Sequence, residues 1–386
     1  MPLGIGGLTS LQTLSKVIIE GDDGFNISDL KGLVNLQSPL SIKGLDKVIN
    51  PIQAKDASLN QKKGLCDLEM EWANHVSEDF GMPCNRVLDV SFNETTEYEV
   101  LQGLKPHNKL RNLKILFYGG KQFPRWVGDP SFDQLRELTL RGCISCEQLP
   151  ALGHLQSLQM LSVESLNAVV NLDSMFLAHT NSVHHVAFPS LTVLKFKHMP
   201  RWERWSTSVG GDNATSGLFP RLGEIYIGFC PKLAEVSIGF IPSLRDVTIQ
   251  FCGILKSYSC PNSVENLCIG YCGSLTSLTF STVHEIPSSL KTLGIDGCYN
   301  LRSFGEGYFI YLTDLCISGC DNIETIEQGV KSFGCLLPPS ITWLEVSKFE
   351  DLESLSDVLP HLTCLRTLLI EKCPKLKDLP ETTISL

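Results

Sequence analysis

The stretch Val264-Glu-Asn-Leu-Cys-Ile-Gly-Tyr-Cys-Gly-Ser-Leu-Thr-Ser-Leu278 contains the pattern that decides the fold. Leu267 and Ile269 lie two residues apart, which is the period-2 signal of a short β-strand with one buried side. Leu275 and Leu278 follow after a turn and must point back into the same interior. One such segment does not bury its apolar side chains alone, so the pattern indicates repeats that stack on one another.

The same frame returns along the whole chain, and we take the residue equivalent to Ile269 as the centre of each repeat. About fifteen centres lie about 25 residues apart, and leucine-rich repeats run ~20–29 residues. They are Val17, Ile42, Met70, Val90, Ile115, Leu140, Val163, Phe196, Ile227, Ile249, Ile269, Ile295, Ile317, Val346 and Ile370. The spacing predicts an α/β leucine-rich-repeat solenoid, a curved horseshoe with a parallel β-sheet on its concave face and 3-10, short-helical or irregular segments on its convex face.

The domain prediction is a single array over residues 1–386. Residues 1–130 read as degenerate repeats with helical insertions, and residues 131–386 as regular Cys-containing repeats with long insertions at 167–187 and 206–218. We expect short helices within 46–63 and 93–104. In the second of these, Thr95 and Thr96 are candidate N-caps, and Val100, Leu101 and Leu104 are expected to face inward.

Cysteine is abundant, with 15 residues, and its positions follow the repeat. Seven cysteines lie three residues after a centre, a turn position that suits a small buried side chain with a weak S–H donor. They form a predicted structural ladder: Cys143, Cys230, Cys252, Cys272, Cys298, Cys320 and Cys373. Cys268 and Cys316 immediately precede their centres, so we expect exposed thiols there.

Composition and charge narrow the function classes. A chain that is 43% hydrophobic is too apolar for disorder, and a net charge of −10 argues against broad nucleic-acid binding. We find no apolar run long enough to span a membrane and no secretory signal. The expectation is a cytoplasmic protein, with the nucleus as an alternative, that binds neither nucleic acid nor membrane.

The sequence contains no recognisable set of catalytic residues, so it predicts a non-enzymatic protein without cofactor or metal. Nucleotide loops, the Ser elbow and the His-Glu-x-x-His metal helix are absent. Cys143 and Cys146 form a lone Cys-x-x-Cys pair, and His179, His184 and His185 read as a surface loop. Trp202 and Trp205 are expected to close the core of a long repeat rather than to stack on nucleic-acid bases.

The predicted interaction surface is the concave sheet, whose exposed positions lie at −1, +1 and +2 from each centre. At +2, Phe229, Phe251 and Tyr271 should form one aromatic stripe, because stacked strands lie about 4.8 Å apart. Exposed aromatics of this kind commonly mark protein interfaces. The alternatives are that a flanking loop covers the rings or that the stripe only stabilises the sheet. The remaining candidate binding residues are Tyr226, Lys195, Lys197, His198, Arg141 and Asp296.

Several motifs together resemble the leucine-rich-repeat region of plant intracellular nucleotide-binding disease resistance proteins of the coiled-coil type. The motifs are Gly4-Ile-Gly-Gly-Leu-Thr-Ser-Leu-Gln-Thr-Leu14, Leu68-Glu-Met-Glu-Trp72, Tyr118-Gly-Gly-Lys-Gln-Phe-Pro-Arg-Trp126, Leu149-Pro-Ala-Leu-Gly153 and Met199-Pro-Arg-Trp-Glu-Arg-Trp205. The resemblance implies recognition of pathogen effectors or monitored host proteins, and in a full-length relative contact with the nucleotide-binding module. That module has no counterpart in this sequence, so only the recognition surface carries over.

Three other functions remain open at this point. One is a substrate-receptor solenoid of a ubiquitin ligase, which also uses Cys-containing repeats but would need an upstream helical module. Another is a hydrolase or redox enzyme built on the solenoid, for which we find no supporting residues. The third is an extracellular receptor, which the missing signal peptide and the unpaired cysteines argue against.

Overall fold

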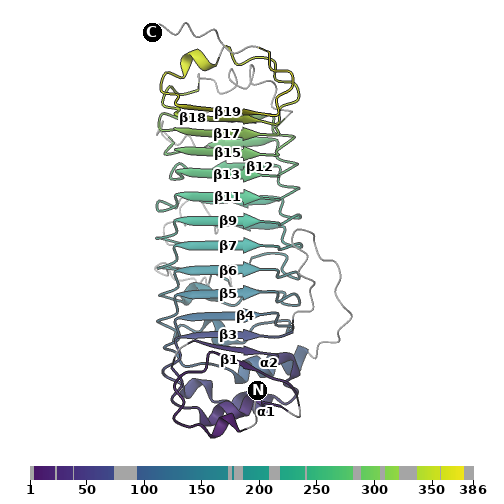
Figure 1. Ribbon diagram of the computed structural model, residues 1–386, viewed down its shortest axis with the longest axis vertical. Coiled ribbons are helices and arrows are strands. Elements are labelled where there is room, and N and C mark those ends of the chain that lie inside the picture. Colours follow the sequence, from purple (N-terminus) through teal and green to yellow (C-terminus); the bar gives the residue numbers. More distant parts are fainter. Residues whose placement is uncertain are drawn as a thin grey trace. The chain divides into compact units, whose positions relative to one another are not determined.

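The computed structural model describes residues 4–21, 24–37, 39–73, 94–172, 176–177, 186–207, 218–239, 241–280, 288–304, 309–320, 337–356 and 358–377. The chain forms two compact units: unit 1 holds residues 1–202 and 217–222, and unit 2 holds residues 203–216 and 223–386. Figure 1 labels the strands and helices and colours them along the sequence. The predicted centre Val90, most of the insertion 206–218 and His179, His184 and His185 lie outside the described residues.

Unit 1 is built on parallel strands that pair in chain order. They are β1 (Lys16–Ile18), β2 (Leu40–Lys43), β3 (Asp67–Glu71), β4 (Asn112–Leu116), β5 (Glu137–Arg141), β6 (Met160–Glu164) and β7 (Val193–Lys197). The register aligns successive repeat centres, as in the pair Leu140 and Val163. β3 pairs directly with β4, where Met70 lies opposite Ile115.

Unit 2 repeats this arrangement with β9 (Glu224–Gly228), β11 (Asp246–Gln250), β13 (Asn266–Gly270), β15 (Thr292–Asp296), β17 (Asp314–Ser318), β18 (Trp343–Ser347) and β19 (Thr367–Glu371). Ile249 aligns with Ile269, and Ile269 with Ile295, so the predicted centres again share one row. The strand positions at the centre and two residues before it are buried, while those at −1 and +1 lie on the open face of the sheet.

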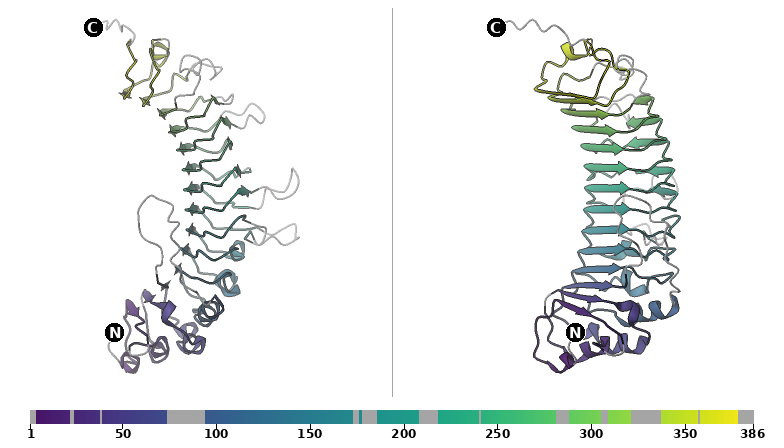
Figure 2. Two further views of the ribbon diagram at one scale, coloured as in Figure 1. Left: turned by 90° about the vertical axis from the view of Figure 1, so that its right-hand side faces the viewer. Right: turned by 45° about the vertical axis from the view of Figure 1, so that its right-hand side comes forward.

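The segments that return from one strand to the next differ between the two units. In unit 1 they include the α-helices α1 (Pro51–Asp56) and α2 (Glu94–Gly103) and the 3-10 helices η1 (Ile5–Gly7), η2 (Ile27–Gly32), η3 (Leu45–Lys47), η4 (Leu59–Gln61), η5 (Arg125–Gly128) and η6 (Leu152–His154). In unit 2 they include short parallel strands: β8 (Arg204–Ser206) pairs with β10 (Glu235–Ser237), and β14 (Ser277–Phe280) pairs with β12 (Ser257–Cys260) and β16 (Ser303–Phe304). The 3-10 helix η9 (Leu359–His361) also lies in unit 2. These short strands were not expected from the sequence, and Figure 2 shows them behind the main sheet.

Helix α2 lies inside the segment 93–104 that the sequence predicts as helical. Its inward residues are confirmed, since Val100, Leu101 and Leu104 are buried. The predicted N-caps are wrong: the helix begins at Glu94, so Thr95 and Thr96 lie in its first turn. Acidic residues in that turn suit the positive end of the helix dipole.

The core is the stacked set of apolar side chains from every repeat. Leu267, Ile269, Leu275 and Leu278 of the sequence pattern are all at most 1% exposed. Burial of each such side chain is worth about 1.5–3 kcal/mol, so the repeats stabilise one another through this continuous interior.

The tryptophans of the 201–205 segment are confirmed as core residues. Trp202 and Trp205 are buried, and the Trp202 ring lies 5.0 Å from the ring of Phe196. The arrangement leaves neither indole available for stacking on nucleic-acid bases.

The cysteines of the predicted ladder lie just after their strands. Cys143, Cys230, Cys252, Cys272, Cys298 and Cys320 are buried, and Cys373 is half-buried. Each thiol lies close to the carbonyl oxygen two residues earlier, as with the 3.3 Å from the Cys230 Sγ to the Gly228 oxygen. Because the S–H group is the donor, the protonated thiol satisfies a carbonyl at the edge of the core.

The two thiols that were expected to be exposed on the open face are half-buried, so this prediction is wrong in degree. Cys268 and Cys316 lie at −1 on β13 and β17, between neighbouring strands that cover much of each side chain. Desolvation raises the pKa of Cys268, and desolvation together with a hydrogen bond to Glu345 raises the pKa of Cys316 to about 12. Both therefore stay protonated near neutral pH.

A left-handed residue follows the main strand of most repeats, and we call this row the left-handed ladder. Its non-glycine members have φ between 52° and 59° and its glycines between 56° and 79°. They are Gly44, Phe117, Gly142, Ser165, His198, Phe229, Phe251, Tyr271, Gly297, Gly319, Lys348 and Lys372. This conformation costs an ordinary residue about 1–2 kcal/mol. It is held in place because the backbone N–H reaches the next strand, as in the 2.9 Å bond from Phe251 N to the Gly270 oxygen.

Candidate protein-interaction surface

Three aromatic members of the left-handed ladder form a stack on unit 2, which confirms the predicted stripe. The ring centroids of Phe229 and Phe251 lie 4.4 Å apart with planes inclined by 8°, and those of Phe251 and Tyr271 lie 4.7 Å apart with planes inclined by 6°. Phe251 and Tyr271 are 37% and 39% exposed, while Phe229 is half-buried. The spacing of the rings follows the spacing of the strands beneath them.

A polar contact continues from the last ring of the stack. The Tyr271 hydroxyl hydrogen-bonds to the Asp296 carboxylate, and the Lys348 Nζ lies 3.3 Å from the Asp296 Oδ1. Desolvation acts to raise the pKa of Asp296, but hydrogen bonding to Tyr271, Ser318 and Lys348 outweighs it and holds that pKa below its ordinary value. Asp296 is thus a carboxylate at neutral pH, bound on two sides.

Beside this contact the surface of unit 2 is hollowed by a pocket of about 310 Å³. Its walls include Tyr271, Tyr299 and Lys348, and Gly297 and Gly319 lie between them. These glycines occupy left-handed-ladder positions that hold side chains in the neighbouring repeats. The pocket is therefore a place where two successive repeats display no side chain.

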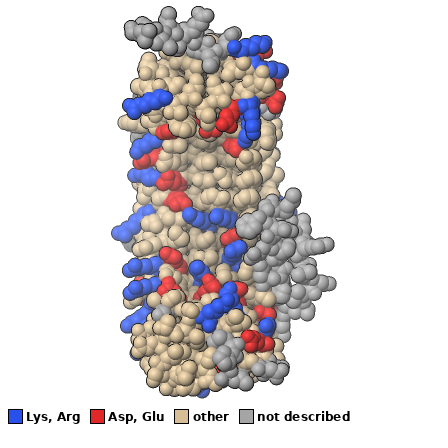
Figure 3. All heavy atoms as spheres, viewed as in Figure 1, with Lys and Arg blue, Asp and Glu red and all other residues tan. Residues whose placement is uncertain are grey.

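The open face of unit 2 around the stack carries mostly small or uncharged residues. The −1 and +1 positions of β11, β13 and β15 are Thr248, Gln250, Cys268, Gly270, Gly294 and Asp296. Figure 3 shows this face, with few charged side chains over β11 and β13. Tyr226, at −1 on β9, is half-buried, and desolvation raises its pKa.

Four predicted residues lie on unit 1, where the open face is charged. Arg141 Nε pairs with Glu164 Oε2 at 3.7 Å across β5 and β6. His198 lies within electrostatic reach of both: desolvation lowers its pKa, Glu164 opposes this, and Lys197 and Arg141 add to the lowering. Lys195 and Lys197 occupy the −1 and +1 positions of β7 and are half-buried. The structure thus gathers Arg141, Lys197 and His198 around Glu164.

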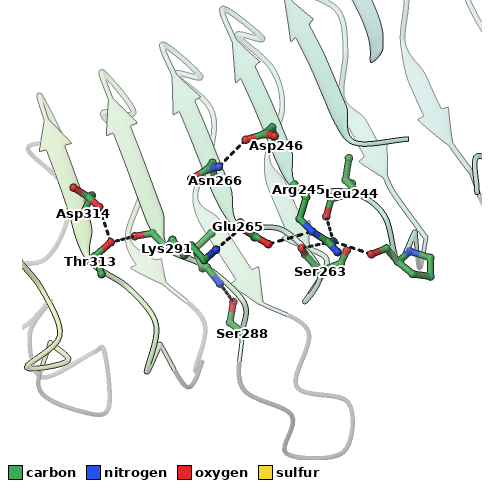
Figure 4. A network of polar contacts seen from close by, with 12 residues as sticks. Leu244, Arg245, Asp246, Ser263, Glu265, Asn266, Ser288, Lys291, Thr313 and Asp314 are labelled. Carbon is green, nitrogen blue, oxygen red and sulfur yellow. Dashed lines mark hydrogen bonds and ion pairs between the residues drawn. The ribbon is translucent and has the colours of Figure 1, made fainter. Parts of the chain in front are cut away.

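A separate polar network follows the edge where the strands of unit 2 begin (Figure 4). Glu265 accepts from the Arg245 Nε at 3.1 Å and from the Lys291 Nζ at 2.6 Å. The hydrogen bond from Lys291 lowers the pKa of Glu265. Because Glu265 pairs with two cations from neighbouring repeats, we interpret this network as structural. Each exposed ion pair of this kind stabilises the fold by only about 0–1 kcal/mol.

Sequence reasoning missed the residues that complete the unit 2 surface, above all Lys348, Tyr299, Gly297 and Gly319. The signal was present, because Gly297, Gly319 and Lys348 occupy the same +2 position as the aromatic stripe. None of the helices in the described ranges is long and apolar enough to cross a membrane. Among those residues there is also no group of three or more His, Cys, Asp and Glu side chains placed to hold a metal ion.

The stacked parallel strands with an inward Leu-x-Ile pattern and a buried cysteine turn define a leucine-rich-repeat solenoid, so the predicted fold class is confirmed. Residues 27–166 match the R13L1/DRL21 LRRs. The chain is a leucine-rich-repeat region of the kind found in plant disease resistance proteins.

Two relatives from Arabidopsis thaliana support this assignment. The chain is 36% identical over 223 residues to disease resistance protein At3g14460, covering 57% of this chain and 15% of the relative. It is 32% identical over 319 residues to disease resistance RPP13-like protein 1, covering 74% of this chain and 29% of the relative. The chain thus spans less than a third of the length of either relative.

Among solved structures, the leucine-rich repeat domain of the type III effector XCV3220 (XopL) is similar, with a TM-score of 0.40 and 19% identity over 57% of this chain and 70% of that one.

Proposed function

We propose that this chain is a non-catalytic protein-recognition region in plant defence, and that it binds its protein ligand through the open face of unit 2. The observation that carries the proposal is the exposed stack of Phe229, Phe251 and Tyr271. Relatives that are disease resistance proteins support the defence role.

The stack has the properties of an interaction hot spot. Aromatic side chains supply large contact areas, and those at the centre of an interface contribute most of its binding energy. Here the rings are already stacked, and the backbone beneath them is tied to the next strand by the bonds from Phe229 N and Phe251 N. Little conformational entropy remains to be lost on binding, which favours affinity.

The ligand class follows from the relatives and from the surface. We infer that it is a pathogen effector or a monitored host protein, as the resemblance to disease resistance proteins implies. We further propose a cytoplasmic location, which fits a ladder of thiols that donate S–H hydrogen bonds and must stay reduced to do so.

The test is a library screen followed by quantitative binding. The full chain is displayed against cloned pathogen effectors and leaf proteins, and purified hits are measured by biolayer interferometry. Phe251→Ala combined with Tyr271→Ala should weaken capture about tenfold or more, as expected for hot-spot rings. The matched control is Tyr311→Ala, an exposed aromatic 54% accessible in the turn that precedes β17.

Equal affinity of the double variant and the control would contradict the proposal. Thermal unfolding of both variants is measured alongside, because loss of folding in the double variant would assign the rings to stability. A ligase complex recovered on the same surface would favour the substrate-receptor alternative.

A further inference from the structure

The open face of unit 1 carries a group of basic side chains, although the net charge of the whole chain is −10. We call this group the β7 patch, and it consists of Arg141, Lys195, Lys197 and His198 around Glu164. Arg141 lies opposite Glu164, and Glu164 lies opposite Lys197, in the row one residue after the repeat centres. Lys195 lies in the row one residue before the centres. The patch therefore extends over three neighbouring strands.

Glu164 offsets only part of the positive charge of the β7 patch. Its Oε2 lies 3.7 Å from the Arg141 Nε, which is longer than a hydrogen bond, and one carboxylate offsets one cation. Desolvation, aided by Lys197 and Arg141, lowers the pKa of His198 against the effect of Glu164, so the imidazole is neutral at pH 7. Three cations and one carboxylate leave the patch with a net positive charge.

Lys195 and Lys197 are two residues apart on β7, so both side chains leave the same side of the sheet. Their Cα atoms are about 6.6 Å apart, because an extended strand rises by about 3.3 Å per residue. Both side chains are half-buried, and a lysine in this setting buries its stem and keeps its ammonium group at the surface. Two like charges held side by side oppose folding, and Glu164 lies opposite only one of them. A ligand explains their placement better than stability does.

The ligand that matches this spacing is an extended polypeptide with two acidic side chains separated by one residue. In such a segment alternate side chains also point to one side, about 6.6 Å apart, so each carboxylate meets one lysine. Ser162 lies opposite Lys195, and Thr139 lies opposite Ser162. Both are half-buried, and their hydroxyl groups are further donors for a carboxylate.

A nucleic acid is less well matched to the β7 patch. Proteins that bind single strands follow the phosphates over several nucleotides and stack the bases on aromatic rings. The open-face positions of β5, β6 and β7 carry no Phe, Tyr or Trp. The two lysines of β7 match two successive charges, which suits a short acidic segment.

We propose that Lys195 and Lys197 bind an extended segment of a protein partner in which two acidic residues are separated by one residue. Ser162 and Thr139 are assigned as additional donors. The surface lies on unit 1, whereas the aromatic stack lies on unit 2, so this inference does not depend on the proposed function.

The first test compares three labelled peptides for binding to the full chain by fluorescence anisotropy. The probe is acetyl-Thr-Glu-Thr-Glu-Thr-amide, and the controls are the same peptide with glutamine in place of glutamate and acetyl-Thr-Thr-Glu-Glu-Thr-amide. We expect the probe to bind at least about fivefold more tightly than the glutamine peptide, because two ion pairs are lost. It should bind about threefold more tightly than the peptide with adjacent glutamates, whose side chains point to opposite sides when extended.

A second test locates the site. Lys195→Gln combined with Lys197→Gln should reduce binding of the probe to that of the glutamine peptide. The matched control is Lys232→Gln combined with Lys256→Gln, which removes two exposed lysines of unit 2 and changes the net charge equally. Control and wild type should bind the probe equally. Thermal unfolding of both double variants checks that the fold is retained.

Equal binding of the two glutamate peptides by the wild-type chain would overturn the proposal, and this result does not depend on any variant. Undiminished probe binding by a folded Lys195→Gln and Lys197→Gln variant would overturn it as well. The oligonucleotide dT12 serves as a competitor. If it binds more tightly than the probe and loses affinity in the same variant, the patch is a nucleic-acid site and the proposal is wrong.

Discussion

The ammonium of Lys62 lies 2.6 Å from the carbonyl oxygen of Leu30, in the fully buried interior of unit 1. It also donates to the Leu33 oxygen at 3.0 Å, so it binds one carbonyl in the last turn of η2 and one at the residue that follows η2. Burial of a cation without a carboxylate partner lowers the pKa of Lys62 to about 8. The side chain thus ties one repeat to the next while its charge opposes folding.

The depressed pKa of Lys62 predicts a stability that rises with alkalinity. Between about pH 8 and the ordinary lysine value of 10.5, the unfolded chain binds the proton that the folded chain has released, so folding becomes more favourable as pH rises. The expected gain is on the order of 1 kcal/mol per unit of pKa difference. Urea denaturation at pH 7.5, 9 and 10.5 measures it.

Lys62→Met is the reference, since every other titrating group is common to both chains. The wild type should gain stability relative to Lys62→Met across this range. Parallel pH profiles for the two chains would mean that Lys62 titrates normally. At pH 7.5 the variant also removes the Lys62 donor from the Leu33 carbonyl, which costs about 1–3 kcal/mol, whereas the Leu30 carbonyl keeps its bond from the Leu33 N–H.

The raised pKa of Glu97 predicts the opposite dependence of stability on pH. Desolvation by burial raises its pKa to about 7, although the backbone N–H of Gly119, 2.5 Å from Oε2, acts to lower it. Because the folded pKa lies above the ordinary value of 4.5, the contribution of Glu97 to stability is complete below pH 4.5 and is lost as pH rises through 7. Glu97→Gln keeps an acceptor for Gly119 and should remove this loss.

The comparison is made by urea denaturation from pH 4.5 to 8. The exposed Glu99→Gln in the same helix is the control and should retain the wild-type profile. A profile of Glu97→Gln that runs parallel to that of Glu99→Gln would show that Glu97 is ionised throughout.

The cysteines of the structural ladder should not react with alkylating reagents in the folded protein. A hydrogen bond to Cys252, together with burial, raises the pKa of Cys272 to about 12, so its thiolate is scarce at pH 8. Iodoacetamide followed by peptide mass spectrometry should label the exposed Cys364 first and Cys272 only after unfolding in urea. Rapid native labelling of Cys272 would contradict the ladder.

Two neighbouring glycines should differ sharply in their tolerance of alanine. Gly297→Ala places a methyl group 2.8 Å from the Tyr271 ring, whereas Gly319→Ala meets only ordinary contacts. Both residues have positive φ, so the backbone cost is shared and the difference reports the ring alone. We expect Gly297→Ala to be less stable by about 1–3 kcal/mol, as for overpacking. Thermal unfolding that gives equal Tm values would show that the Tyr271 ring moves aside freely.

Much of the scaffold could be predicted from the sequence. A leucine and an isoleucine two residues apart on a strand point to the same side, so both are buried only when that side faces the stacked interior. The aligned centres, such as Ile249 and Ile269, follow from that rule. The short strands behind the main sheet of unit 2 were not predicted. Tyr258 and Cys260 do alternate with serines in Ser257–Cys260, but only one strand was assigned to each repeat, and the segment after the turn was read only as a return to the interior.

The candidate site was predicted only in part. The stack was foreseen because Phe229, Phe251 and Tyr271 share one position, but that position was taken as part of the strand. Spacing reports which side a residue faces and says nothing of its φ, and an aromatic gives no local sign of a left-handed backbone. The pocket was not predicted because it forms where Gly297 and Gly319 have no side chains. A search of the sequence for reactive side chains does not consider glycine.

The left-handed ladder has a consequence for how such a region can diversify. Glycine, serine, histidine, lysine, phenylalanine and tyrosine all occupy this position with nearly the same φ, which the hydrogen bond to the next strand imposes. A point mutation there exchanges what the surface displays and leaves the path of the main chain unaltered. Recognition can therefore change one codon at a time, repeat by repeat, while the interior that holds the array together is inherited intact.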